Sequence, residues 1–504
     1  MPVASRLSSI RANVAEARAG RAALLALLVL AAVGASAQAP ESRWPDDVRK
    51  CELSAAAGRI TASALCGTLS VPEDRADPDG RRIELAWAVI EAATASPEPD
   101  PVFFLAGGPG QSARDTAPII RRYLDDVNAT RDLVFLDQRG TGGSNSLDCE
   151  FDDELFLTEP DVEQIDALLR DCHAQFDADV RHYTTLDAVA DLDALRQHLG
   201  FERVNLVGGS YGTRVAQVYL REHPDRVRSV VLDGVVPMRL KLGSEHAEKL
   251  DRAIEKLLAE CADDAACSDR FPDLDAAFAE LKRTWSEQPR TIQVTHPRTG
   301  VAEDMEFSQP VLASSLRFLA YSPVTQMMIP YLIHEAAATG SPERLAAQAL
   351  MTSSEMSEQI AIGLNFSVGC AEDWPYWPDE THSDGTLLGD SFTELYATVC
   401  DWWPADPVAR SFHDPVTARV PVLLLSGELD PVTPPEYGDE AAVEFPVSRH
   451  IVAEGRGHIT MSNHCIAGIT TEFIDAASVD SLDDDCIDTI GREPFFLSLL
   501  GPSP

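Results

Sequence analysis

Short apolar runs alternate with longer amphipathic stretches between residues 67 and 236 of the chain. The runs at 102–105, 133–136 and 229–232 are rich in Val, Leu and Phe, which is typical of strands that are buried on both faces. Between 186 and 196 the apolar residues recur at helical spacing. Strands of this kind interleaved with helices predict an α/β fold, with a mostly parallel central sheet that helices cover on both faces.

The pattern changes between residues 237 and 405, where helical periodicity dominates. Helices are expected at 245–261 and 274–285, and a turn-forming pair after the run 291–294 predicts a small hairpin. We interpret this segment as a mainly helical cap that is inserted into the sheet domain.

The sheet pattern resumes after the predicted cap. A buried strand is expected at 421–427 and a weaker one at 450–452. The tail from 481 to 504 is acidic and then apolar, which favours packing as a final helix. Residues 38–236 and 406–504 are therefore expected to form the two parts of one α/β core.

Residues 1–37 have the features of a secretory signal peptide. Basic residues precede an apolar run at 22–33, and Ala35-Ser36-Ala37 follows it as a small-residue cleavage site. The apolar run is shorter than a comfortable membrane span, and an uncleaved anchor is the alternative. We expect an exported protein, periplasmic or extracellular, that has no membrane attachment after cleavage. The basic residues are Arg6, Arg11, Arg18 and Arg21.

The composition limits the classes of partner. The chain has 504 residues, of which 45% are hydrophobic, so it can form a large globular core. Its 81 acidic side chains exceed its 41 lysines and arginines, and the formal net charge is -40 at pH 7. Such a surface repels nucleic-acid phosphates and anionic membranes, which argues against partners of either kind.

Ten cysteines all follow the predicted cleavage site, and their number is even. In an exported protein this indicates a set of disulfide bonds. No C-x-x-C motif occurs, so the sequence offers no sign of a zinc-ribbon or thioredoxin-like site. The simplest pairing joins sequence neighbours: Cys51 with Cys66, Cys149 with Cys172, Cys261 with Cys267, Cys370 with Cys400, and Cys465 with Cys486.

Ser210 is the candidate nucleophile. It lies in the G-x-S-x-G motif 208–212, after the apolar run 204–207 and before the helix-like stretch 213–220. A serine on a sharp turn between a strand and a helix has a strained backbone and an accessible hydroxyl group. The alternative is a glycine-rich turn that happens to contain a serine, but the strand before it and the helix after it favour the nucleophile.

A serine nucleophile needs a base, and the base needs an orienting carboxylate. His458 follows a glycine-rich turn and Asp430 follows the predicted strand 421–427, which gives the chain order Ser, Asp, His that is typical of such sheets. Catalytic groups gather at the carboxyl ends of strands in open α/β sheets, which supports this choice. The rivals are the acids Glu428 and Asp233 and the flanking histidines His450 and His464.

Backbone N–H groups are expected to stabilise the negative oxygen that forms during attack. One is the amide of Tyr211, directly after the nucleophile. The other is expected in the turn 106–110 after an early core strand, and Gly108 is the candidate because a side chain there would block the substrate. The alternative is an ordinary Gly-Pro turn.

Four motifs support a resemblance to a known family. They are G-G-P-G at 107–110, D-Q-R-G-T-G-G-S at 137–144, G-G-S-Y-G at 208–212 and G-E-L-D-P-V-T-P at 427–434. Together they resemble the α/β-hydrolase superfamily and, within it, the prolyl and tripeptidyl aminopeptidases. Prolyl aminopeptidases commonly have histidine before G-G-P-G, whereas this chain has Ala106, which fits the tripeptidyl-like members better.

The resemblance implies a serine peptidase that releases short N-terminal fragments, of the tripeptide or proline type, without a metal or organic cofactor. It also implies that acidic residues on the cap side bind the free α-ammonium group of the peptide substrate. Glu372 and Asp373 are the candidates for this contact, and a solvated acidic pair is the other interpretation. Arg139 is expected to be structural and to hold the loop after its strand.

Two other functions remain open. An exported carboxylic-ester hydrolase would use the same three residues, and rapid cleavage of short acyl esters without peptide activity would favour it. A non-catalytic binding protein on the same fold would not react with a fluorophosphonate probe. The sequence leaves open how many residues are released per cut and the oligomeric state.

Overall fold

The structure, a computed structural model, describes residues 43–45, 48–55, 58–149, 151, 161–357, 359–379, 382–480 and 482–502, without the side chains of 352–357. The predicted signal peptide at 1–37 lies outside the described residues. From Arg49 onward the chain forms one unit, and the description below concerns that unit.

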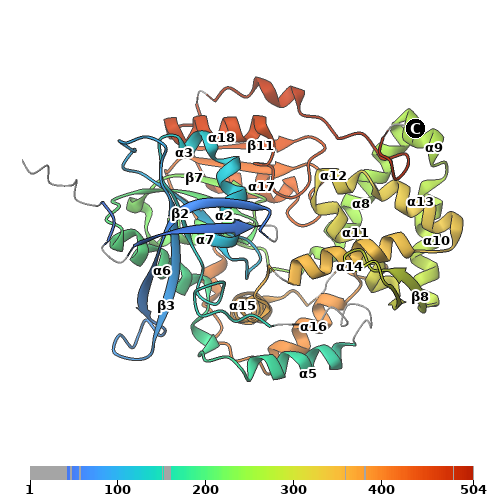
Figure 1. Ribbon diagram of the computed structural model, residues 1–504, viewed down its shortest axis with the longest axis horizontal. Coiled ribbons are helices and arrows are strands. Elements are labelled where there is room, and N and C mark those ends of the chain that lie inside the picture. Colours follow the sequence, from blue (N-terminus) through green and yellow to red (C-terminus); the bar gives the residue numbers. More distant parts are fainter. Residues whose placement is uncertain are drawn as a thin grey trace, which may run out of the picture. The chain divides into compact units, whose positions relative to one another are not determined.

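Nine strands of the described residues form one sheet in the order β1-β2-β3-β5-β4-β6-β7-β10-β11 (Figure 1). The strands β5, β4, β6, β7, β10 and β11 run parallel to one another. The pairs β1–β2, β2–β3 and β3–β5 are antiparallel. The mostly parallel sheet is therefore confirmed. The strands are β1 (Arg49–Ala55), β2 (Ile60–Pro72), β3 (Arg82–Ile90), β4 (Val102–Leu105), β5 (Leu133–Leu136), β6 (Val204–Gly209), β7 (Val227–Asp233), β10 (Val422–Gly427) and β11 (Ser448–Ala453).

Helices cover both faces of the sheet. Alternate residues of its strands point to opposite sides, so each face presents apolar side chains against which helices pack. Phe104 packs on one face in a cluster that includes Ala117 of α2 and residues of α18. The next residue, Leu105, borders a small void on the other face together with Leu192 of α6 and Val215 of α7. These helices are α2 (Ala113–Tyr123), α6 (Thr185–His198), α7 (Tyr211–Glu222) and α18 (His464–Ala476).

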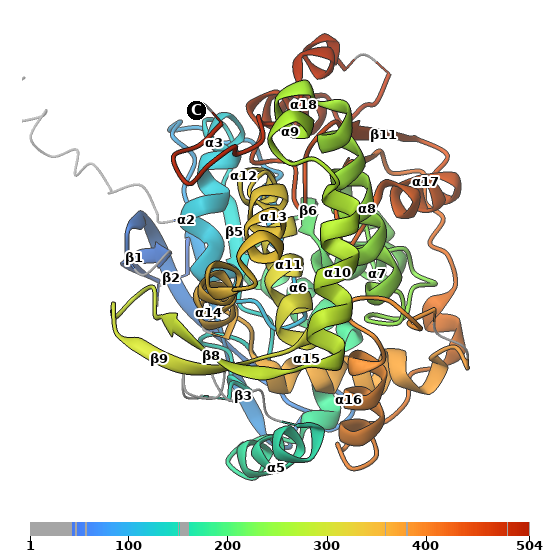
Figure 2. The same cartoon turned by 90° about the vertical axis from the view of Figure 1, so that its right-hand side faces the viewer.

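The segment between β7 and β10 is mainly helical, and several of its helices lie side by side (Figure 2). The predicted helices at 245–261 and 274–285 are confirmed as α8 and α10, and the predicted hairpin is confirmed as β8 and β9, which pair antiparallel. The elements include α8 (His246–Asp263), α9 (Ala265–Arg270), α10 (Leu274–Glu287), β8 (Arg290–Thr295), β9 (Ala302–Phe307), α11 (Gln309–Tyr321), α12 (Pro323–Gln326), α13 (Ile329–Thr339), α14 (Glu343–Ser357), α15 (Ile362–Val368) and α16 (Ser391–Cys400).

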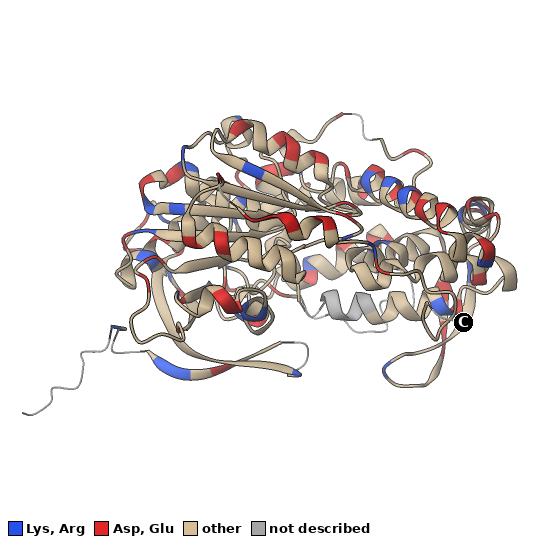
Figure 3. Cartoon of the chain, turned by 90° about the horizontal axis from the view of Figure 1, so that it is seen from above, with Lys and Arg blue, Asp and Glu red and all other residues tan. Residues whose placement is uncertain are grey.

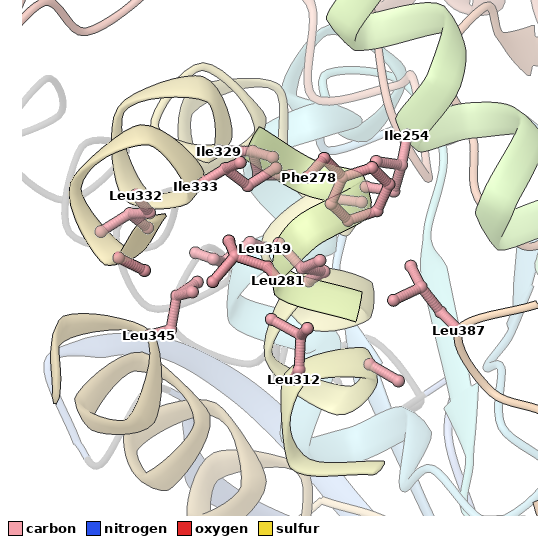
Figure 4. Packing of buried hydrophobic residues seen from close by; sticks show 14 of the residues in the cluster. Ile254, Phe278, Leu281, Leu312, Leu319, Ile329, Leu332, Ile333, Leu345 and Leu387 are labelled. Atoms are coloured by element: carbon pink, nitrogen blue, oxygen red, sulfur yellow. The ribbon is translucent and has the colours of Figure 1, made fainter. Parts of the chain in front are cut away.

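Most of these helices pack around a common hydrophobic cluster, which Figure 4 shows from close by. Ile254 of α8, Phe278 of α10 and Leu312 of α11 contribute to it, and all are buried. A core of this kind gives the segment the internal support that an inserted cap needs. The division of the chain into a cap at 237–405 and a two-part core stays a prediction.

All ten cysteines form disulfides, and each pairs with its neighbour in the sequence, as predicted. The Cys370–Cys400 bond joins the turn after α15 to the end of α16. Disulfides persist in oxidising compartments, which agrees with export. No helix within the described ranges is long and apolar enough to cross a membrane.

The predicted final helix in the tail is wrong. In the described part of the tail, residues 482–502, the only helical element is the short 3-10 turn η6 (Asp485–Thr489). Phe495 is buried in the hydrophobic cluster of the helical segment, and the amide of Phe496 donates to the carbonyl of Met327 at 3.0 Å. Phe495 is thus buried against the helices without lying in a helix itself, whereas Leu499 and Leu500 near the end of the tail are exposed.

Acidic residues are spread along many helices and loops rather than gathered in one place (Figure 3). Many of the arginines and lysines lie beside them in ion pairs, such as Arg283 with Glu280 at 2.7 Å. Exposed pairs of this kind contribute little to stability, so the excess of carboxylates chiefly favours solubility.

Candidate active site

Ser210 lies on the turn between β6 and α7, and its backbone is strained. Its φ of 54° and ψ of -124° are unusual for a residue with a side chain. Two hydrogen bonds hold it there: its amide donates to the carbonyl of Asp233 at 2.9 Å, and the amide of Thr213 donates to its carbonyl at 2.8 Å. The strained turn that the sequence predicts is therefore present.

The glycines around Ser210 are required by close backbone contacts. A Cβ atom on Gly208 would lie 2.5 Å from the carbonyl oxygen of Gly212. A Cβ atom on Gly212 would lie 2.1 Å from the carbonyl oxygen of Leu105, at the end of β4. Since any side chain would collide here, glycine is what lets α7 begin directly against the neighbouring strands.

His458 and Asp430 are in contact. Nδ1 of His458 lies 2.8 Å from Oδ2 of Asp430, which is buried. The amides of Val432 and Thr433 both donate to Oδ1 of Asp430 at 2.8 Å, and the Thr433 hydroxyl donates to Oδ2 at 2.7 Å. The carboxylate is thus fixed in one orientation, in which it accepts a hydrogen bond from Nδ1–H of the imidazole ring.

The two groups shift each other's protonation. Burial alone would raise the pKa of Asp430, but the charge of His458 and the hydrogen bonds to the carboxylate bring that pKa below its usual range. Burial alone would lower the pKa of His458, yet the charge of Asp430 and its hydrogen bond raise that pKa above 6.5. The carboxylate therefore stabilises the protonated imidazole, which a general base needs when it takes up a proton.

A residue of the helical segment also holds the imidazole. The ring of Tyr321, the last residue of α11, meets the ring of His458 edge-on with centroids 5.2 Å apart. The backbone amide of His458 donates to the carbonyl of Tyr321 at 2.9 Å. This contact could not be predicted from the sequence, because helical periodicity does not tell what the end of a helix faces.

The rival residues have other partners. Both carboxylate oxygens of Asp233 accept the amide of Thr460 at 2.9 Å, and burial raises the pKa of Asp233. Glu428 pairs with Lys256 at 2.8 Å. His450 lies 2.9 Å from Asp439. These contacts favour Asp430 over the rival acids and His458 over His450.

Ser210 and His458 line the same cavity, which has a volume of about 450 Å³. The loops that carry Ser210, Asp430 and His458 follow the carboxyl ends of β6, β10 and β11, at one edge of the parallel part of the sheet. Among the cavity's other lining residues are Gly107, Gly108, Tyr211, Val236, Leu240, His246, Arg317, Tyr321, Phe392, Tyr396, Val432 and Thr433.

Both predicted donors for a negative oxygen border this cavity. Gly108 has a φ of 107°, which favours glycine, and Gly107 beside it lies close to Ser210, because a Cβ on Gly107 would be 3.1 Å from the Cβ of Ser210. Tyr211 is the first residue of α7, and amides in the first turn of a helix have no acceptor within the helix. Their positions agree with the predicted role, which stays a prediction.

Glu372 and Asp373 lie where a contact with substrate is not favoured. Both are fully buried, and neither lines the cavity. Glu372 accepts the amide of Thr185 at 2.6 Å, and burial raises its pKa to about 8. Asp373 pairs with Nη1 of Arg214 at 3.0 Å. This geometry does not favour a direct contact with an ammonium group, because buried Arg214 already neutralises Asp373, and the role of Glu372 and Asp373 in amine binding stays a prediction.

Arg139 is structural, as expected. It is fully buried, and its guanidinium group donates to both oxygens of Asp191 at 2.7 and 2.8 Å. The neighbouring Asp137 accepts from the Ser112 hydroxyl at 2.8 Å and from the amide of Gly143 at 3.0 Å. The D-Q-R-G motif therefore ties together the loops beside the cavity.

Replacing Arg214 by methionine is expected to lower the free energy of unfolding by about 3–5 kcal/mol, because the carboxylate of Asp373 would remain buried without a partner. The midpoint of urea unfolding measures this change. The double variant Arg214→Met with Asp373→Leu is the control, and it is expected to recover most of the loss. If the Arg214→Met variant were as stable as the wild type, Arg214 would not be needed to neutralise the charge of Asp373, and this interpretation would be contradicted.

The comparison with sequence families decides the fold family: the profile described as alpha/beta hydrolase fold matches residues 100–464. The chain belongs to the α/β-hydrolase fold family. The match includes the nucleophile turn and the loops with Asp430 and His458, as well as the helical segment between β7 and β10. The α/β-hydrolase fold that the motifs suggested is therefore confirmed.

Relatives within the α/β hydrolases cover most of the chain. A protein of Streptomyces lividans named tripeptidyl aminopeptidase is 26% identical over 452 residues, which are 84% of this chain and 83% of that protein. The serine protease Hip1 of Mycobacterium tuberculosis is 24% identical over 481 residues, 86% of this chain and 89% of that one. A crystal structure of the proline iminopeptidase of Mycobacterium smegmatis covers 82% of this chain and 98% of its own, at 18% identity and a TM-score of 0.40.

Proposed function

We propose that this α/β hydrolase is an exported serine peptidase that releases short N-terminal fragments from peptides. The contact of 2.8 Å between His458 and Asp430, beside the strained Ser210 in one cavity, carries the proposal. The names of the relatives from Streptomyces and Mycobacterium support peptides as the substrate class. The predicted signal peptide and the disulfides support export.

The proposed reaction proceeds through an acyl-enzyme. Ser210 Oγ attacks the carbonyl carbon of the scissile bond while His458 takes the hydroxyl proton, and the amides of Gly108 and Tyr211 stabilise the negative oxygen. The tetrahedral intermediate collapses when the imidazolium ring gives its proton to the leaving amine. A water molecule, deprotonated by His458, then attacks the ester carbonyl and releases the N-terminal fragment. Asp430 holds the imidazole ring in place throughout.

Purified protein is expected to hydrolyse tripeptidyl anilides with a free amine at least about tenfold faster than the same anilides with a blocked amine, because one lost charge-assisted contact costs about 1.5–3 kcal/mol. Values of kcat/KM for the matched pairs measure the preference. Equal turnover of both members would argue against an aminopeptidase. Fast hydrolysis of short acyl esters without any peptide cleavage would instead favour the ester hydrolase.

A further inference from the structure

Arg317 is a cationic residue in the wall of the cavity that contains Ser210 and His458. It lies on α11 four residues before Tyr321, so the two side chains leave the same face of the helix. The ring of Tyr321 contacts the imidazole ring of His458, with centroids 5.2 Å apart. Arg317 is therefore about one helical turn away from a residue that touches the proposed base.

Two neighbours hold the guanidinium group in place. It lies over the ring of Phe392, 4.8 Å from the ring centroid. Its Nη2 lies 3.3 Å from Nδ1 of His246 at the start of α8. Burial and the charge of Arg317 keep the pKa of His246 well below its usual value, so the neutral ring accepts this hydrogen bond. The arginine is thus oriented by neutral groups, which leave its charge uncompensated.

No carboxylate in the described part of the chain forms an ion pair with Arg317. Other inward-facing arginines of this acidic protein differ in this respect, since Arg139 pairs with Asp191 at 2.7 Å and Arg214 with Asp373 at 3.0 Å. A partly buried guanidinium group is a strong donor for a planar carboxylate. Arg317 therefore has its charge and donors available on the cavity side.

The cavity wall itself has no acidic side chain among the residues that the structure describes. Asp430 lies behind the imidazole ring and is engaged with His458 and Thr433. Arg317 is therefore the only Lys, Arg, Asp or Glu side chain among the described residues of the cavity wall, in contrast to the acidic composition of the protein. The α11 side of the cavity therefore attracts an anionic group and repels an ammonium group.

We propose that Arg317 forms an anion subsite of the cavity and binds a carboxylate group of the substrate. This inference rests on the proposed peptidase function and makes its substrate class more specific. A peptide offers a carboxylate from two sources, the side chain of an acidic residue and its own C-terminus. A substrate ammonium group is expected to bind away from α11.

The test uses matched peptides that differ only in charge. One set has Glu or Gln at a single position, and the other has a free or an amidated C-terminus. In the set that varies the carboxylate bound by Arg317, the wild type is expected to prefer the carboxylate form by about tenfold or more in kcat/KM. Arg317→Gln is expected to bring that ratio close to one, and Arg317→Lys to retain part of it, because lysine keeps the charge but not the planar donor pair.

Three controls separate the possible outcomes. Arg283→Gln removes an exposed arginine of α10 and is expected to leave both the ratio and the activity unchanged. Raising the salt concentration is expected to lower the wild-type ratio without any mutation. A wild-type ratio near one in every pair, or an unchanged ratio in Arg317→Gln, would overturn the anion subsite. Reaction of Ser210 with a fluorophosphonate tests the proposed function separately, since it does not depend on Arg317.

Discussion

Replacing Ser210 by alanine is expected to lower kcat for peptide anilides by about 10⁶-fold, since removing the nucleophile disables the whole catalytic unit. The same variant is expected to lose all covalent labelling by a fluorophosphonate probe. The strained turn exposes the hydroxyl to the cavity, and removing one oxygen atom changes no packing contact that the fold needs. Initial rates with a chromogenic tripeptidyl anilide, together with mass spectrometry of the labelled protein, measure both effects.

The matched control is Ser462→Ala, which removes an exposed hydroxyl group four residues after His458. This variant is expected to keep the activity and the labelling of the wild type. Peptide hydrolysis at the wild-type rate by Ser210→Ala would refute the acyl-enzyme mechanism. Labelling of Ser210→Ala at another residue would place the nucleophile elsewhere in the chain.

Those parts of the fold that depend on local patterns could be predicted from the sequence. Runs such as 102–105 and 133–136 are apolar at every position because both faces of their strands are buried, and they coincide with β4 and β5. The role of the glycines around Ser210 could also be predicted, because a side chain there would collide with the backbone of adjacent elements. The strained turn follows from such signals, whereas Asp430 and His458 could be chosen because each follows the carboxyl end of a predicted strand.

Contacts between residues far apart in the chain could not be predicted in the same way. Glu372 and Asp373 form an acidic pair in the sequence, but the partner of Asp373 is Arg214, 159 positions away. Tyr321 and Arg317 occupy one face of a helix, and helical periodicity does not reveal that this face meets the cavity. The tail beyond 481 has apolar residues that indicate burial, and only the packing of the helical segment decides that Phe495 is buried without a final helix.

The pH dependence offers the sharpest test of Asp430, because its effect on His458 has a definite sign. The neutral imidazole is the form that accepts the proton of Ser210. In the wild type the charge of Asp430 raises the pKa of His458 above 6.5 despite burial, so kcat/KM is expected to fall as the pH drops through that raised value. Without the carboxylate, burial remains and lowers the pKa of the ring.

Asp430→Asn is therefore expected to move the acidic limb of the kcat/KM profile to lower pH. It is also expected to lower kcat by about 10⁴-fold at neutral pH, because the amide cannot stabilise the imidazolium ring or fix its tautomer. Profiles recorded between about pH 5 and about pH 9 measure both changes, and this range brackets the ordinary histidine pKa.

Asp439→Asn is the matched control for this experiment. Asp439 lies 2.9 Å from Nδ1 of His450, so this variant removes a carboxylate from another imidazole ring that does not line the cavity. Its profile is expected to match that of the wild type. An acidic limb that stays in place in Asp430→Asn would show that His458 is not the titrating base. A limb that moves to higher pH would show that Asp430 does not stabilise the protonated ring.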